Sequence, residues 1–227
     1  MNCYVIIPAF NEANSVGKVI QAIPKEQVKD IIVVNNNSND QTSVVALENG
    51  AVVLSEPRQG YGYACLKGIE YLEGKAVDIV VFLDADYSDY PEQLPEVIAP
   101  IVHKGYDFVI GSRALGKKEN GSMTPQQVFG NWLATRLIKL FFGVTYTDLG
   151  PFRAIRYEKL IAMQMEDTTY GWTVEMQLKA AKMGLKTTEV AVDYKKRIGV
   201  SKVSGTVKGT VLAGYKILLW IFKYTLK

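Results

Sequence analysis

The chain has 227 residues, of which 48% are hydrophobic and 22% are charged, and its formal net charge is +3. This composition excludes a disordered chain, and the net charge is too small to indicate nucleic-acid binding by itself. Cys3 and Cys65 lie in apolar stretches without metal-site spacing, which predicts free, buried thiols rather than a zinc site. The one histidine, His103, falls in the expected last turn of a helix, so histidine-based catalysis is not expected.

The first half of the chain alternates short β-rich runs with helix-length segments. This alternation predicts an α/β fold with a mostly parallel sheet flanked by helices. Gly50, Gly74 and Gly105 stand where three of the helices would end, and Pro91 suits the first turn of another. The predicted strands are residues 3–7, 30–34, 51–54, 78–83 and 106–110.

The second half begins with a polar loop at residues 116–124, which suits either a mobile lid or an ordinary surface loop. Helices are predicted at about 125–142 and at 171–182, and a strand at 187–194. No composition break divides the chain, so one domain is expected over residues 1–227.

The last segment, residues 207–226, predicts an amphipathic helix. Its apolar positions recur at helical spacing, but Lys208, Lys216 and Lys223 interrupt it too often for a membrane span. It suits an interfacial helix, a partner contact or a helix packed on its own core. The apolar run at residues 3–8 is too short for a signal peptide, so we expect a cytoplasmic protein, peripheral on the inner face of the cell membrane if this helix is interfacial.

Two carboxylates, Asp84 and Asp86, follow the most apolar predicted strand. Ligands of open α/β sheets bind outside the carboxyl ends of the strands. Two carboxylates there repel each other unless a cation lies between them, and hard oxygen ligands favour Mg²⁺ or Mn²⁺. The alternative is that Asp84 and Asp86 are turn or helix-capping residues.

Polar residues also end the first two strands, at residues 8–12 and 35–40. With Asp84-Ala85-Asp86, their order resembles the family 2 glycosyltransferases, which have the GT-A fold and use nucleotide-activated sugars. The resemblance implies a metal at Asp84 and Asp86, and acidic residues are usual in the family where this chain has Asn35 and Asn36. The nucleotide-binding residues that it implies are Pro8, Ala9, Phe10, Glu12, Asn36, Gly60, Asp84, Ala85 and Asp86.

Four downstream segments, at residues 111–113, 148–153, 171–176 and 197–202, are similar to those of polyprenyl-phosphate sugar synthases of the dolichyl-phosphate mannose synthase type. The resemblance implies that Arg113 faces an acceptor phosphate and Arg197 the donor diphosphate, with Arg153 and Lys202 also on the phosphate or acceptor side. The chain departs from that group at Gln126 and Gln127, where the group tends to carry an arginine, and at Ser88, where it often carries a glutamine. The implied parts are a nucleotide-sugar half (1–112), an acceptor-side half (113–206) and a C-terminal helix (207–227).

The predicted function is therefore metal-dependent, inverting transfer of a sugar from a nucleoside-diphosphate sugar to an acceptor. UDP-sugar is favoured and GDP-sugar is the alternative donor; the acceptor is polyprenyl phosphate or another lipid-linked molecule. If the acceptor is a hydroxyl, Asp148 or Glu175 is the expected base, whereas an ionised phosphate needs none. The competing hypothesis is a non-catalytic nucleotide-sugar-binding protein on the same fold. The sequence predicts no oligomeric state.

Overall fold

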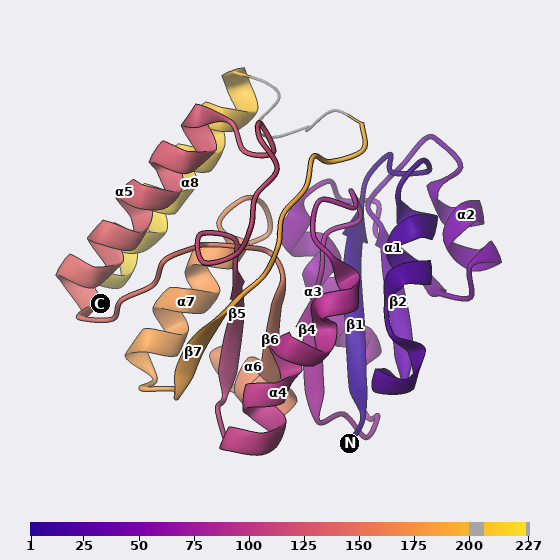
Figure 1. The fold of residues 1–227 in the computed structure, drawn as a ribbon, viewed down its shortest axis with the longest axis horizontal. Helices are drawn as coiled ribbons and strands as arrows, with labels where there is room; N and C mark the ends of the chain where they lie inside the picture. The colour runs from indigo at the N-terminus through magenta and orange to yellow at the C-terminus, as the bar shows by residue number, and fades with distance from the viewer. Residues whose placement is uncertain (200–206, 226–227) are drawn as a thin grey trace.

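The computed structural model describes residues 1–199 and 207–225. At its centre is a seven-stranded sheet with the strand order β3-β2-β1-β4-β6-β5-β7 (Figure 1). Neighbouring strands are parallel except β6, which runs antiparallel to both β4 and β5. The strands are β1 (Cys3–Ala9), β2 (Asp30–Asn35), β3 (Val52–Ser55), β4 (Ile79–Phe82), β5 (Phe108–Ser112), β6 (Arg153–Arg156) and β7 (Thr187–Ala191).

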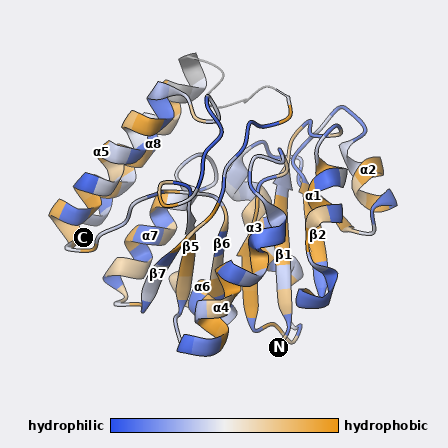
Figure 2. Ribbon diagram, viewed as in Figure 1, coloured by the Kyte–Doolittle hydropathy of each residue, from blue (hydrophilic) through white to orange (hydrophobic). Residues whose placement is uncertain are grey.

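Helices cover both faces of the sheet. The side chains of β1 alternate between the two faces: Tyr4 and Ile6 belong to the hydrophobic cluster that includes residues of α3, α5, α6, α7 and α8, whereas Val5 and Ile7 belong to the cluster that includes residues of α1, α2 and α4. Both faces are buried, which explains the continuous hydrophobic runs of the central strands (Figure 2). The helices are α1 (Val16–Ala22), α2 (Thr42–Glu48), α3 (Tyr61–Tyr71), α4 (Leu94–Lys104), α5 (Pro125–Phe142), α6 (Tyr157–Met163), α7 (Trp172–Lys182) and α8 (Val207–Thr225), with short 3₁₀ turns η1 (Lys25–Gln27) and η2 (Pro91–Gln93).

The predicted α/β fold is confirmed, and the local signals explain the element ends. Gly50, Gly74 and Gly105 all have positive φ, as expected where helices end. Helix α5 begins where predicted, because Thr124 and Gln127 form a reciprocal capping box. Gln127, which departs from the polyprenyl-phosphate synthase pattern, thus stabilises the start of this helix.

The sequence interpretation missed β6 and α6. Residues 148–153 were expected to be an acceptor-side motif, but the chain continues from there into β6 and pairs between β4 and β5. The four-residue run RAIR carries arginines at both ends and therefore lacks the apolar pattern of the other inner strands.

Helices α5 and α8 lie side by side at one end of the molecule (Figure 1). The rings of Phe141 and Phe222 meet edge to face, 5.9 Å apart between centroids. The two helices nevertheless leave many large apolar side chains exposed, and we call this surface the α5–α8 face. No helix in the described ranges is long and apolar enough to cross a membrane. The exposed side chains are Val128, Phe129, Trp132, Leu140, Phe141, Val211, Leu212, Tyr215, Leu219 and Phe222.

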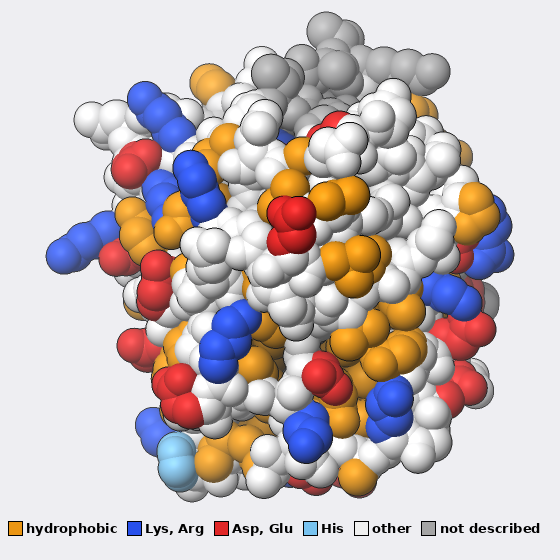
Figure 3. Space-filling model, turned by 90° about the vertical axis from the view of Figure 1, so that its right-hand side faces the viewer, with side chains coloured by type: hydrophobic (Ala, Val, Ile, Leu, Met, Phe, Trp, Pro, Cys, Tyr) orange, Lys and Arg blue, Asp and Glu red, His pale blue; other side chains and the backbone are white. Residues whose placement is uncertain are grey.

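The side of the molecule that carries α1 and α2 differs from the α5–α8 face. Figure 3 shows basic and acidic side chains interspersed on this side, as on an ordinary solvated surface. Both thiols are buried as predicted, and burial raises the pKa of Cys3 to about 12. His103 lies exposed in the last turn of α4, also as predicted.

Candidate active site

A pocket of about 330 Å³ lies at the carboxyl ends of β1, β2 and β4. The strand order reverses beside β1, which is the position where open α/β sheets bind ligands. All nine predicted nucleotide-binding residues line this pocket, together with Arg197. The lining residues outside the predicted nucleotide-binding set are Gln59 and Tyr61, which flank the predicted Gly60, and Thr169 and Tyr170, which no sequence pattern indicated.

Asp84 and Asp86 enter the pocket directly after β4. Asp84 accepts a hydrogen bond from the Tyr61 hydroxyl at 2.9 Å, and Asp86 accepts from the backbone N–H and hydroxyl of Ser88 at 2.9 and 2.5 Å. Burial and the neighbouring charge of Asp86 raise the pKa of Asp84 to about 7. A divalent cation would relieve this repulsion, so the pair fits Mg²⁺ or Mn²⁺ chemically. In the described chain no third acidic, histidine or cysteine side chain joins them, which leaves coordination positions for water and substrate phosphate.

Arg197 reaches the same pocket from the segment after β7. Its Nη2 atom lies 2.6 Å from Oε1 of Glu12, and its Nη1 atom lies 3.0 Å from Oδ2 of Asp86. The guanidinium group therefore joins the end of β1 to the end of β4. It is a fixed positive charge beside the predicted metal site, suited to a diphosphate.

Asn36 lines the pocket, but its amide also holds the 56–60 segment. Its Nδ2 donates to the carbonyl of Arg58 at 2.7 Å, and its Oδ1 accepts from the N–H of Gly60 at 2.7 Å. Gly60 is needed there, because a Cβ atom would lie 2.2 Å from the carbonyl oxygen of Thr168. The structure thus gives Asn36 a positioning role in addition to its place in the pocket wall.

A second cavity, of about 410 Å³, lies between α5 and the 145–148 segment. Three cationic side chains line it, and none of them forms an ion pair within the part of the chain that the structure describes. Its apolar wall is continuous with the α5–α8 face through Val128 and Trp132. The cationic residues are Lys118, Arg136 and Lys139.

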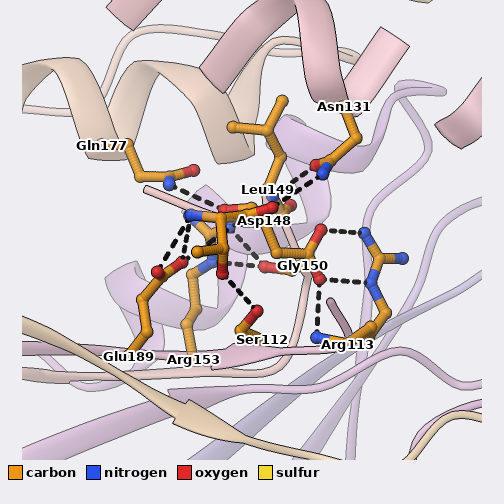
Figure 4. A network of polar contacts seen from close by, with 10 residues as sticks. Ser112, Arg113, Asn131, Asp148, Leu149, Gly150, Arg153, Gln177 and Glu189 are labelled. Carbon is orange, nitrogen blue, oxygen red and sulfur yellow. Dashed lines mark hydrogen bonds and ion pairs between the residues drawn. The ribbon is translucent and has the colours of Figure 1, made fainter. Parts of the chain in front are cut away.

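Asp148 lines this second cavity and forms a buried ion pair with Arg113 (Figure 4). Arg113 Nε and Nη2 each lie 2.7 Å from one oxygen of the Asp148 carboxylate, and the backbone N–H of Arg113 donates to it at 2.8 Å. Burial alone would raise the pKa of Asp148, but Arg113 outweighs burial and holds that pKa below its ordinary value. Asp148 is therefore poorly suited to the predicted role of a base, and Arg113 is partly neutralised.

Arg153, which was predicted on the phosphate or acceptor side, has another role in the structure. Arg153 is fully buried and donates to the carbonyls of Leu149, Gly150 and Thr173, so its guanidinium faces backbone rather than the predicted phosphate (Figure 4). Burial lowers the pKa of Arg153 to about 10.

Glu175 was the other predicted base, and it lines neither cavity. It is fully buried, and its carboxylate accepts from the backbone N–H groups of Glu166 and Asp167, each at 2.8 Å, and pairs with Lys179 at 2.8 Å. Its place in the first turn of α7 lets it cap the preceding segment, which is a structural role. Lys202, the remaining predicted phosphate ligand, lies outside the described residues.

Asp89 was not assigned any role from the sequence. It is 2% exposed, and neither of its carboxylate oxygens has a hydrogen-bond partner among the described residues. Burial, followed by the charge of Asp84, raises its pKa well above the ordinary value. A buried acid without hydrogen-bond partners lowers the free energy of unfolding, so Asp89 destabilises the folded protein.

Comparisons with known proteins agree with this geometry. Residues 4–163 match the model of glycosyl transferase family 2. The chain is 34% identical over 211 residues to an uncharacterized glycosyltransferase of Mycobacterium tuberculosis, covering 92% of this chain and 93% of that protein. It is 30% identical over 226 residues to the undecaprenyl-phosphate mannosyltransferase of Micrococcus luteus, covering 92% and 90%.

Among solved structures, the fold is similar to that of glucosyl-3-phosphoglycerate synthase from M. tuberculosis in complex with Mn²⁺, UDP-glucose and phosphoglyceric acid. The TM-score is 0.78 at 20% identity, covering 99% of this chain and 79% of that one. This similarity establishes the fold, which is the GT-A fold expected from the sequence. The family match covers most of the chain, and the chain is a member of glycosyl transferase family 2.

Proposed function

We propose that the protein transfers a hexosyl group from a UDP-sugar to polyprenyl phosphate, with inversion at the anomeric carbon and with a divalent metal at Asp84 and Asp86. The observation that carries the donor half is the pocket itself, where Asp84, Asp86 and Arg197 meet the predicted nucleoside-binding residues. Support for uridine and Mn²⁺ comes from the solved relative with the same fold, which was crystallised with both Mn²⁺ and UDP-glucose. GDP-sugar remains the alternative donor.

The second cavity supports an acceptor that is both anionic and apolar. Lys118, Arg136 and Lys139 provide positive charge that no ion pair among the described residues neutralises, whereas Met123, Val128 and Trp132 provide an apolar wall. A phosphate group on a hydrocarbon chain matches this combination, since the cations bind the phosphate and the apolar side chains contact the hydrocarbon. The mannosyltransferase relative, named for undecaprenyl phosphate, points in the same direction.

The state of the two predicted bases also favours a phosphate acceptor. Asp148 is held in an ion pair with Arg113, and Glu175 is bonded to backbone and to Lys179. A hydroxyl acceptor would need one of them to take a proton, whereas a phosphate is already ionised near neutral pH. With a phosphate acceptor, the chemical step would need neither Asp148 nor Glu175 as a base.

In the proposed reaction an acceptor oxygen attacks the anomeric carbon while the bond to the diphosphate breaks. The metal would supply Lewis-acid stabilisation of the charge that develops on the departing nucleoside diphosphate. Arg197 would add a fixed hydrogen-bond donor to the same oxygens. Asn36 would keep the 56–60 segment against the nucleoside side of the pocket.

A lipid acceptor requires access to a membrane, and we assign this contact to the α5–α8 face. Neither 125–142 nor 207–225 contains an acidic residue, whereas Arg136 and Lys139 of α5 are basic and exposed. An exposed apolar surface with basic residues fits an anionic bilayer surface. The proposal therefore includes peripheral binding to the cytoplasmic leaflet.

The direct test is a donor and acceptor screen on the full chain. UDP-sugars and GDP-mannose are offered with Mn²⁺ or Mg²⁺, together with undecaprenyl phosphate, undecaprenol or no acceptor, and nucleoside diphosphate release and product mass are measured. The proposal expects metal-dependent release with a UDP-sugar that undecaprenyl phosphate stimulates and undecaprenol does not. Binding of the nucleotide sugar without turnover under every condition would instead favour the non-catalytic binding protein. Equal stimulation by undecaprenol would overturn the phosphate acceptor.

A further inference from the structure

The donor pocket is completed by a segment that α8 holds in place. This segment, which we call the 166–171 loop, precedes α7 and contributes Thr169 and Tyr170 to the pocket wall. On its inner side it packs against the start of α3, where the N–H of Tyr63 donates to the carbonyl of Thr168 at 3.1 Å. A Cβ atom on Gly62 would lie 2.0 Å from the carbonyl oxygen of Asp167, so the two segments are in close backbone contact.

Asp167 organises this loop from its centre. Its Oδ1 accepts from the backbone N–H groups of Thr169 at 2.7 Å and Gly171 at 2.9 Å. Its Oδ2 accepts from the indole Nε1–H of Trp220 in α8 at 2.6 Å, and Lys216 Nζ lies 3.6 Å from the same oxygen. Asp167 is 1% exposed, so these hydrogen bonds to a carboxylate lie in the low-dielectric interior, where they are stronger than in water.

The loop and Trp220 also fit closely in space. A Cβ atom at Gly171 would lie 2.3 Å from Cδ1 of the indole ring. Trp220 is itself buried and stacks on Tyr224, with 5.5 Å between ring centroids. A second link joins the same two elements, because Lys223 Nζ lies 2.8 Å from Oε2 of Glu166.

The two faces of helix α8 thus differ in their contacts. Its inner face carries Trp220, Lys216 and Lys223 and fixes the 166–171 loop, whereas its outer face is part of the exposed α5–α8 face. In Figure 1 the helix lies across the end of the sheet beside α7, far from the nucleotide-binding strand β1. The buried contact between α8 and the 166–171 loop is centred on Asp167, and the Lys223–Glu166 pair adds a more exposed link.

We propose that Asp167 and Trp220 are positioning residues for donor binding, through which α8 sets the affinity of the nucleotide-sugar pocket. The proposal rests on the proposed function of that pocket. The Trp220–Asp167 bond keeps Thr169 and Tyr170 against the donor, so an α8 that shifts or detaches loosens one wall of the pocket. Binding at the α5–α8 face and binding of the donor are coupled in consequence, and each strengthens the other.

The test compares Trp220→Phe with Tyr224→Phe by calorimetric titration of UDP in the presence of Mn²⁺. Trp220→Phe keeps an aromatic ring but removes the donor to Asp167. Tyr224→Phe removes a polar atom from the next turn of α8 that forms no hydrogen bond in the described chain. Loss of a hydrogen bond to a charged group predicts a UDP Kd roughly tenfold higher in Trp220→Phe, with an unchanged number of sites per chain. Tyr224→Phe should bind as the wild type does.

The stoichiometry separates this role from a purely structural one. If Trp220→Phe only unfolds part of the sample, the number of sites falls while Kd stays constant, and the proposal is overturned. Asp167→Asn gives a second reading, because the amide keeps the size of the side chain but has one acceptor oxygen, which cannot accept both from Trp220 and from the loop N–H groups; it should raise Kd in the same direction and raise amide hydrogen exchange in the 166–171 loop. Equal Kd values in all the variants overturn the coupling alone, whereas a wild type that does not bind UDP with Mn²⁺ overturns the proposed donor site.

Discussion

Arg197 and Asp86 form an ion pair across the donor pocket, with 3.0 Å between Nη1 and Oδ2. The guanidinium and a metal ion at Asp86 would compete for the same carboxylate oxygen, whereas a diphosphate would attract both. Arg197→Ala should therefore raise the affinity for Mn²⁺ alone by a few-fold and weaken UDP binding by roughly tenfold or more. Titration of Mn²⁺ followed by electron paramagnetic resonance, with and without UDP, measures both effects.

Arg58 provides the matched control for this experiment. It pairs with Glu56 at 2.7 Å and does not line the pocket, so Arg58→Ala should leave both affinities as in the wild type. If Arg197→Ala changes neither affinity, the ion pair with Asp86 is a surface contact without a part in donor binding.

The Arg113–Asp148 pair should be essential for stability. Asp148→Asn leaves Arg113 buried beside a neutral amide, which predicts a loss of about 3–5 kcal/mol in the free energy of unfolding near neutral pH. Because the folded pKa of Asp148 is depressed, its contribution is complete above the unfolded value near 3.8 and is lost as pH falls through the folded pKa. Urea unfolding should show a constant difference from the wild type between pH 8 and pH 5 that shrinks below about pH 4.

Asp89 should have the opposite effect on stability. Its folded pKa is raised, so the wild type loses stability as pH rises above the unfolded value near 3.8. Asp89→Asn removes this dependence, and the gain relative to the wild type should be larger at pH 8 than at pH 4.5 by at least about 1 kcal/mol, since one unit of pKa shift corresponds to about that amount. Thermal unfolding at both pH values checks it, and a gain that does not change with pH would show that the pKa of Asp89 is not raised in the folded protein.

The α5–α8 face should bind anionic vesicles. Leu140 and Tyr215 are 72% and 60% exposed, so glutamate at either position should reduce sedimentation with phosphatidylglycerol vesicles without unfolding the protein. Leu47 in α2 is 59% exposed on another surface, and Leu47→Glu should bind as the wild type does. Binding should also weaken as salt rises, because the basic residues of these helices contribute a screened attraction. Equal binding by all three variants would remove this face as the site of membrane contact.

Much of the donor side could be predicted from the sequence. The alternation of apolar runs and helices located the five parallel strands of the first half, and the polar residues after β1, β2 and β4 had to meet at one edge because parallel strands end together. For this reason the nine residues predicted to bind the nucleotide line one pocket. The roles of these residues remain predictions.

The acceptor side was less predictable because its residues depend on long-range pairing. Arg153 sits at the start of an antiparallel strand that has no apolar signature, and Glu175 is turned inward by the 166–171 loop, which no local pattern indicates. Thr169 and Tyr170 reach the pocket only through that loop. The Arg58–Tyr63 run, by contrast, contained a usable signal, since glycines permit close backbone approach, and Gly60 and Gly62 lie directly against the backbone of residues 167 and 168.

The binding of Mn²⁺ and UDP to the wild type and to Asp86→Asn tests the central claim most directly. The account predicts that UDP binds the wild type more tightly when Mn²⁺ is present, and that Asp86→Asn remains folded but loses this metal dependence, because the amide cannot replace a carboxylate as a ligand for a hard cation. UDP binding that is equally tight with and without Mn²⁺ in both proteins would contradict a metal-assisted donor site at the end of β4.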